Sequence, residues 1–80
     1  MYRLSPRHIE DDFTNALDYD ANGNLIFQGI AKISTAQTAP GWKIKKFTYD
    51  VNNNLTDVQY ADGNDNFDNI WNNRATHTYS

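Results

Sequence analysis

The chain has no cysteine, and among its eighty residues it has only two prolines and four glycines. The absence of cysteine excludes disulfides and thiolate metal sites. The chain also lacks an apolar run of the ~20 residues that a membrane-spanning helix needs. Residues 1–7 lack the apolar core of a secretory signal peptide, so we expect synthesis and retention in the cytosol unless the chain assembles into something that leaves.

A chain of this length forms one domain at most. Such a domain buries only about 60–65% of the surface of its unfolded chain, so we expect neighbouring subunits to support it. Hydrophobic residues make up 39% of the chain, which is enough for a compact core. The net charge of −3 argues against a nucleic-acid-binding or anionic-membrane-binding surface. The basic cluster Lys43, Lys45 and Lys46 is interpreted as a solvated strand face or a guarded sheet edge.

Alternating apolar residues begin at Phe13 and predict a first strand that ends near Tyr19. Asn22 and Gly23 tolerate positive φ and predict a tight hairpin turn into a second strand, residues 24–34. That strand is apolar on both faces, with Ile26 and Ile30 on one of them. We therefore expect it to be covered twice, by the rest of the fold and by a partner.

A second hairpin follows a loop at residues 35–41. Its first strand starts at Trp42 and changes parity near Lys45 and Lys46, which predicts a β-bulge. A turn at residues 50–54 and a strand at residues 55–61 complete it. The string Tyr19-Asp-Ala-Asn-Gly-Asn-Leu-Ile26 returns thirty residues later as Tyr49-Asp-Val-Asn-Asn-Asn-Leu-Thr56, so the two hairpins form a near-repeat.

Near the C-terminus, apolar residues at the spacing i, i+3, i+4 and i+8 predict a short helix near residues 66–73. Residues 76–79 are rich in β-formers and predict a closing strand. The expected fold is all-β: a small antiparallel sheet, sandwich or barrel of about five strands with one short C-terminal helix. Residues 1–12 are expected to form an arm and residues 13–80 a single β domain. The residues expected to determine the fold are Trp42, Phe67, Trp71, Asn22 and Gly23.

The sequence contains few residue patterns that are typical of metal binding or catalysis. Asp18 to Asn24 matches the first half of a calcium loop, but Gly29 stands where the bidentate carboxylate belongs, and an Asn-Gly hairpin produces the same string without an ion. His8 and His77 have no partner at metal-ligand spacing. No serine has an activating motif, and the carboxylates fall mostly in predicted turns. We expect no catalytic residue, metal or cofactor, and therefore no enzyme.

Three further motifs follow the first repeat: Trp42-Lys-Ile-Lys-Lys-Phe-Thr-Tyr-Asp50, Tyr60-Ala-Asp-Gly63 and Phe67-Asp-Asn-Ile-Trp-Asn-Asn-Arg-Ala75. Together with Tyr19 to Leu25, this ordered set resembles short virion structural proteins of tailed bacteriophages, over roughly residues 17–80. Where this chain has Tyr60, that family has Trp.

The resemblance implies a protein made in the host cytoplasm and located in the virion. We expect it to bind capsid, neck or tail subunits, as in capsid decoration, in many symmetric copies. From the net charge we expect no nucleic-acid or membrane partner. The alternative is a receptor- or glycan-binding β-module at a tail fibre or tail tip. The predicted interface residues are Tyr2, Leu4, Ile9, Ile26 and Ile30.

Overall fold

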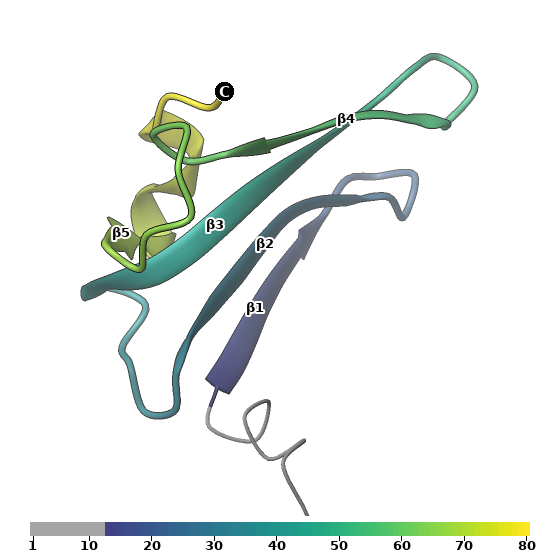
Figure 1. Ribbon diagram of the computed structural model, residues 1–80. Helices are drawn as coiled ribbons and strands as arrows, with labels where there is room; N and C mark the ends of the chain where they lie inside the picture. Colours follow the sequence, from purple (N-terminus) through teal and green to yellow (C-terminus); the bar gives the residue numbers. More distant parts are fainter. Residues whose placement is uncertain (1–12) are drawn as a thin grey trace, which may run out of the picture.

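The computed structural model describes residues 13–80, which form one open antiparallel sheet (Figure 1). The strands β1 (Phe13–Tyr19), β2 (Leu25–Lys32), β3 (Pro40–Tyr49) and β4 (Leu55–Tyr60) lie side by side in chain order. The short β5 (Asn69–Ile70) pairs with the beginning of β3 and leads into a 3-10 helix, η2 (Trp71–Thr76). The predicted all-β fold with five antiparallel strands and one short C-terminal helix is confirmed.

Both hairpin turns are built in the same way, as the near-repeat suggests. In the first, a side-chain oxygen of Asp20 accepts hydrogen bonds from the backbone N–H groups two and four residues later, and Gly23 has φ +82°. In the second, Asp50 accepts the equivalent pair, and Asn53 takes the positive φ of +66°. Asn replaces Gly here because its short polar side chain tolerates the left-handed region.

The core lies on one face of the sheet and consists of two indoles among small residues. The rings of Trp42 and Trp71 lie 6.0 Å apart, and the Trp42 indole N–H donates to the carbonyl of Ala36 at 3.0 Å. A Cβ atom built on Gly29 would lie only 2.5 Å from the Trp71 ring. The remaining buried apolar residues are Ala16, Ala31, Ile44 and Ala61.

The C-terminal segment closes over this core without forming the expected strand. In the predicted strand at residues 76–79, only Tyr79 makes a bridge, to Ala61. The Tyr79 hydroxyl donates to the carbonyl of Arg74 at 2.8 Å, and its ring lies 5.6 Å from that of Phe27. Burial raises the pKa of Tyr79 to about 12. The fifth strand is therefore β5 and not the tail.

Two local predictions need correction. The helix begins at Trp71 and is a 3-10 helix, whereas the spacing predicted residues 66–73; β5 occupies part of that range because Asn69 pairs with Trp42 of β3. The predicted bulge near Lys45 and Lys46 is absent. Pairing with β2 and β4 is regular through both lysines, and the irregularity falls between Thr48 and Tyr49.

We predict that Gly29→Ala destabilises the domain by about 1–3 kcal/mol, the usual cost of overpacking a core. The added methyl group would overlap the Trp71 ring and would also lie 3.0 Å from the Trp42 ring, so the two indoles would have to move apart from the strand. Chemical denaturation measures the change. Gln28→Ala on the same strand is the matched control and should change stability much less, since Gln28 points away from the core. Equal effects from both variants would contradict the packing account.

Candidate functional site: the uncovered face of the sheet

Strand register assigns each side chain to one of two faces. Gly29 and Ile44 are paired across β2 and β3, and both belong to the covered face, where η2 lies. Successive side chains in a strand alternate between faces, so their neighbours point the other way. Ile30 pairs with both Asn15 and Lys43 on this opposite face, which we call the open face.

Apolar side chains are spread over the open face. Leu17 is 50% exposed and Val58 is 41% exposed, although each belongs to a regular strand. Phe47 pairs with Val58 across β3 and β4. Within residues 13–80, η2 and the core lie on the other face, and Phe67 packs over one end of this one, against Phe13. Besides Phe13 and Tyr60, which pair with Lys32 and Lys45, the apolar residues of the open face are Leu17, Ile26, Ile30, Phe47 and Val58.

The charge of the open face is opposite to that of the whole chain. Three lysines, Lys32, Lys43 and Lys45, share it by register. Within the described strands the carboxylates are Asp18 and Asp57, and their partners Phe27 and Thr48 lie on the covered side. The strands therefore present cations and apolar groups together on this face, while the chain as a whole carries −3.

Two of these ammonium groups lie near aromatic rings. The Lys43 nitrogen is 5.2 Å from the centroid of the Phe67 ring, and the Lys45 nitrogen is 5.7 Å from that of Tyr60. A cation within about 6 Å of a ring face is attracted to it, so these contacts help to hold the lysine stems against the sheet. The stems add apolar surface and their charged ends remain accessible to a partner.

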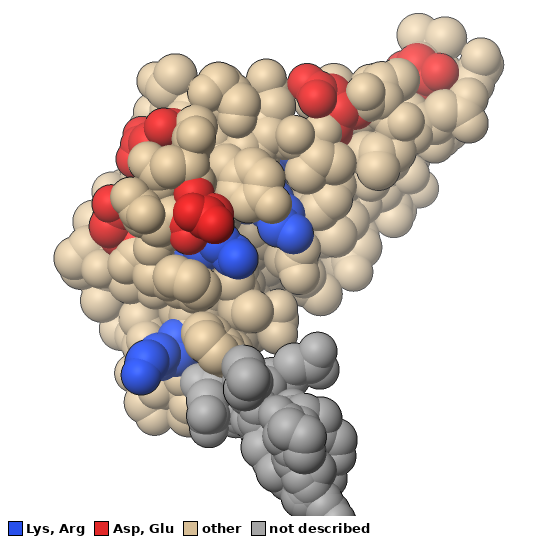
Figure 2. Space-filling model, in the orientation of Figure 1, with Lys and Arg blue, Asp and Glu red and all other residues tan. Residues whose placement is uncertain are grey.

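The carboxylates are placed elsewhere. Figure 2 shows acidic side chains toward the far end of the β3–β4 hairpin and around the C-terminal part of the molecule. On the covered face, Asp18 forms an ion pair with Arg74 at 3.0 Å, and the Arg74 guanidinium stacks 4.5 Å from the centroid of the Trp71 ring. This ion pair ties the edge strand β1 to η2.

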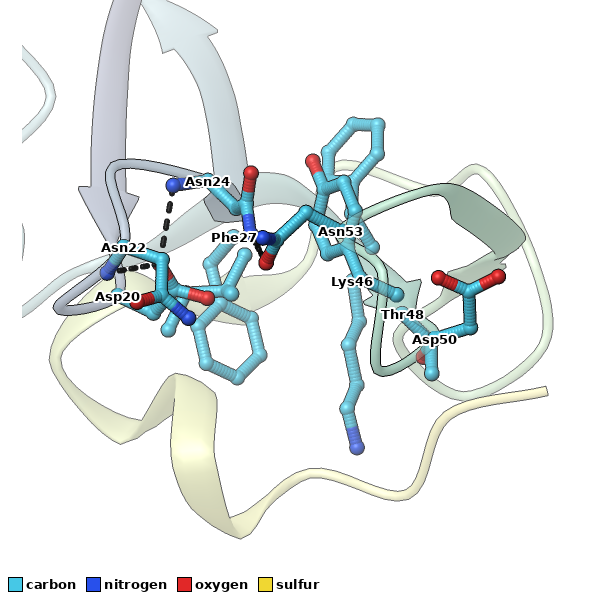
Figure 3. A pocket seen from close by; sticks show the side chains of 11 residues that line it. Asp20, Asn22, Asn24, Phe27, Lys46, Thr48, Asp50 and Asn53 are labelled. Carbon is cyan, nitrogen blue, oxygen red and sulfur yellow. Dashed lines mark hydrogen bonds between the residues drawn. The ribbon is translucent and has the colours of Figure 1, made fainter.

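A second concave region lies between the two hairpin turns (Figure 3). The side chain of Asn24 donates to that of Asn53 at 2.9 Å, and the Tyr49 hydroxyl donates to the Leu25 carbonyl at 2.8 Å. These two bonds hold the turns side by side around a hollow of about 370 Å³. Its lining combines amide and carboxylate side chains with aromatic rings from β2 and β3.

The structure places the sequence-predicted residues in different regions. Trp42 and Trp71 lie in the core, whereas Phe67, expected beside them, is 44% exposed. Asn22 and Gly23 form the first turn. The predicted interface residues Ile26 and Ile30 are half-buried and belong to the open face, and Tyr2, Leu4 and Ile9 lie outside the described residues.

Sequence reasoning missed three members of the open face: Leu17, Phe47 and Val58. For Phe47 the signal was the parity change after Ile44, which we interpreted as a bulge. A regular strand whose apolar residues move from one face to the other produces the same pattern. The side chain of Ile44 lies on the covered face and that of Phe47 lies on the open face.

Within residues 13–80 no three His, Cys, Asp or Glu side chains gather as a metal site would require. The His77 ring instead lies 3.2 Å from the carbonyl of Ile70. No helix in the described part of the chain combines the length and apolar character needed to cross a membrane. Comparison with protein-family models, with curated proteins and with solved structures gave no match to the chain.

The second turn predicts a measurable pH dependence. The pKa of Asp50 is lowered from 3.8, chiefly because the backbone N–H of Asn54 donates to its carboxylate, with further hydrogen bonds from Asn52 and the Asn54 side chain. The ionised form is therefore favoured in the folded state. Its contribution to stability is present above pH 3.8 and is lost as the pH falls through the lowered folded-state pKa.

We expect Asp50→Asn to have a lower melting temperature than the native chain at pH 7, and this difference should disappear at pH values below the folded-state pKa of Asp50. The control Asp57→Asn removes the same charge from β4 without touching the turn. Melting curves from pH 7 to pH 2 measure both. A difference that stays constant over this range would show that the charge of Asp50 does not stabilise the turn.

Proposed function

We propose that this protein is a structural or accessory component of a phage virion that docks onto capsid, neck or tail subunits through the open face. The observation that carries the proposal is a regular sheet face on which Leu17 and Val58 remain about half exposed. Contiguous apolar side chains on a surface mark an interaction site, and Ile26, Ile30 and Phe47 lie on the strands between Leu17 and Val58.

The size of the core supports this function. Six buried apolar residues, three of them alanine, form the core of the described domain. Domains of this size usually gain further stability from disulfides, metals or neighbouring subunits. The chain has no cysteine and therefore cannot form a disulfide. Binding of the folded state by a subunit stabilises the domain by mass action. Residence in a symmetric assembly would thus add the stability that the isolated sheet lacks.

The charge of the open face indicates what such a subunit offers. Lys32, Lys43 and Lys45 call for carboxylates on the partner, placed around apolar side chains that cover Ile30 and Phe47. Complementary charge would raise the association rate and exclude wrong partners more than it would raise affinity. The virion identity itself draws on the resemblance of the Tyr19 to Leu25 and Trp42 to Ala75 motifs to tailed-phage structural proteins.

Substitution of the open face tests the proposal directly. We expect Leu17→Asp combined with Val58→Asp to reduce the copy number of the chain in purified particles by about tenfold or more, since two charges would enter an apolar interface. The control is Val51→Asp, at a turn position that is 97% exposed. Quantitative mass spectrometry of particles measures incorporation, and circular dichroism of the purified variants establishes that they fold.

Absence of the native chain from purified particles would contradict the virion assignment. Normal incorporation of the folded double variant would contradict docking through the open face. Deletion of residues 1–12 separates the contribution of the predicted arm contacts Tyr2, Leu4 and Ile9, because this variant retains the whole sheet.

A specific observation favours one alternative, a receptor- or glycan-binding module. The hollow between the hairpin turns combines Asn22, Asn24 and Asn53 with aromatic rings, and planar polar groups beside a ring suit a sugar. Binding of the purified chain to host-surface glycans, with loss of that binding in Asn53→Ala, would support the alternative. Retained binding in this variant would exclude the hollow as the sugar site.

A further inference from the structure

The first hairpin turn contains the pair Asn22-Gly23, and glycine follows asparagine nowhere else in the chain. Asn22 is exposed in this turn, and Gly23 has φ +82°. Among the described residues, no atom outside its chain neighbours lies within 4 Å of a Cβ atom built on Gly23. The side chain of Asn22 can therefore approach the Gly23 nitrogen without obstruction from a Cβ atom or from another segment.

We infer that Asn22 is a site of spontaneous modification, at which its side-chain amide is converted to a carboxylate. The backbone nitrogen of Gly23 attacks the Asn22 Cγ atom and forms a C–N bond. The side-chain nitrogen leaves as ammonia, together with the proton of the Gly23 N–H group. Water then adds to one carbonyl carbon of the resulting cyclic imide and breaks its bond to the nitrogen. Breaking the bond to Cγ gives aspartate, and breaking the bond to the main-chain carbonyl carbon gives isoaspartate.

The second turn separates the effect of residue type from that of turn geometry. Asn52 occupies the equivalent exposed position and is followed by Asn53. The Gly23 N–H group donates to the carbonyl of Asp20 at 3.1 Å, and the Asn53 N–H group donates to that of Asp50 at 3.0 Å. The two attacking nitrogens are thus restrained by equivalent hydrogen bonds. The sites differ in the side chain that Asn53 has and Gly23 lacks, which obstructs attack in the second turn alone.

The modified residue would lie at the hollow between the two turns, which Asp20 and Asn22 both line (Figure 3). A carboxylate at this position would be repelled by that of Asp20, which accepts the Asn22 N–H group at 2.9 Å. Isoaspartate would also add a methylene group to the main chain just before Asn24, which donates to Asn53. Modification would therefore weaken the link between the turns. This inference is independent of the proposed function.

Reciprocal exchange of the glycine between the two turns tests the inference. Gly23→Asn gives the first turn the residue type that the second turn already accommodates at positive φ, and Asn53→Gly gives the second turn the Asn-Gly pair. The native chain and both variants are incubated in mildly alkaline buffer under folding conditions. Peptide mapping by mass spectrometry measures the conversion at residues 22 and 52, and circular dichroism establishes that each variant is folded.

In the folded native chain we expect conversion at residue 22 to be several-fold faster than at residue 52, with isoaspartate among the products. Gly23→Asn should slow conversion at residue 22 several-fold, and Asn53→Gly should accelerate conversion at residue 52 by a similar factor. Equal rates at the two residues of the native chain would overturn the inference. Conversion at residue 22 that occurs only in the denatured chain would also overturn it, because the folded turn would then protect the site.

Discussion

The structure depends on the close approach of one indole ring to the backbone of a central strand. Trp71 reaches the sheet only because Gly29 has no side chain, and it meets Trp42 there at 6.0 Å. Three of the four other buried apolar residues are alanines, which leave the two large rings the space between the sheet and η2. In an 80-residue chain without cysteine, this aromatic contact replaces the cross-links that small domains often use. The C-terminal segment is held through the same ring, because Arg74 stacks on Trp71 while it pairs with Asp18.

This core is shorter than the strands that carry it. The two hairpins extend beyond the region that η2 covers, and Figure 1 shows them reaching away from the C-terminal segment. Hydrogen bonds hold their far ends in place of packing. Asp20 and Asp50 each accept hydrogen bonds within one turn, and a hydrogen bond from Asn24 to Asn53 joins the two turns. The apolar residues of the open face lie on the opposite side of the sheet from the core, so the core cannot cover them.

The sequence was most informative where local chemistry decides the structure. The period-two alternation and the Asx turns located four strands, because side-chain alternation and positive φ leave few other conformations. It was least informative at residues 66–73, where Phe67, Ile70 and Trp71 have helical spacing. There tertiary contacts decide: β5 pairs with the start of β3, and Trp71 turns toward Gly29. Likewise, no local signal distinguishes a bulge at Lys45 from a regular strand whose apolar residues change face. Which face is apolar at each point of β3 depends on how far η2 extends along the strand.

Charge is divided between the open face, which carries Lys32, Lys43 and Lys45, and the turns, which carry Asp20 and Asp50. A carboxylate on the covered face is tolerated where a cation meets it, as Asp18 meets Arg74. On the open face, lysine is favoured because its long stem covers aromatic surface while its ammonium group stays hydrated, as Lys43 and Lys45 do. Under the proposed docking, such a face would favour a surface that brings carboxylates. In that case the open face would select partners by opposite charge, in spite of its apolar content.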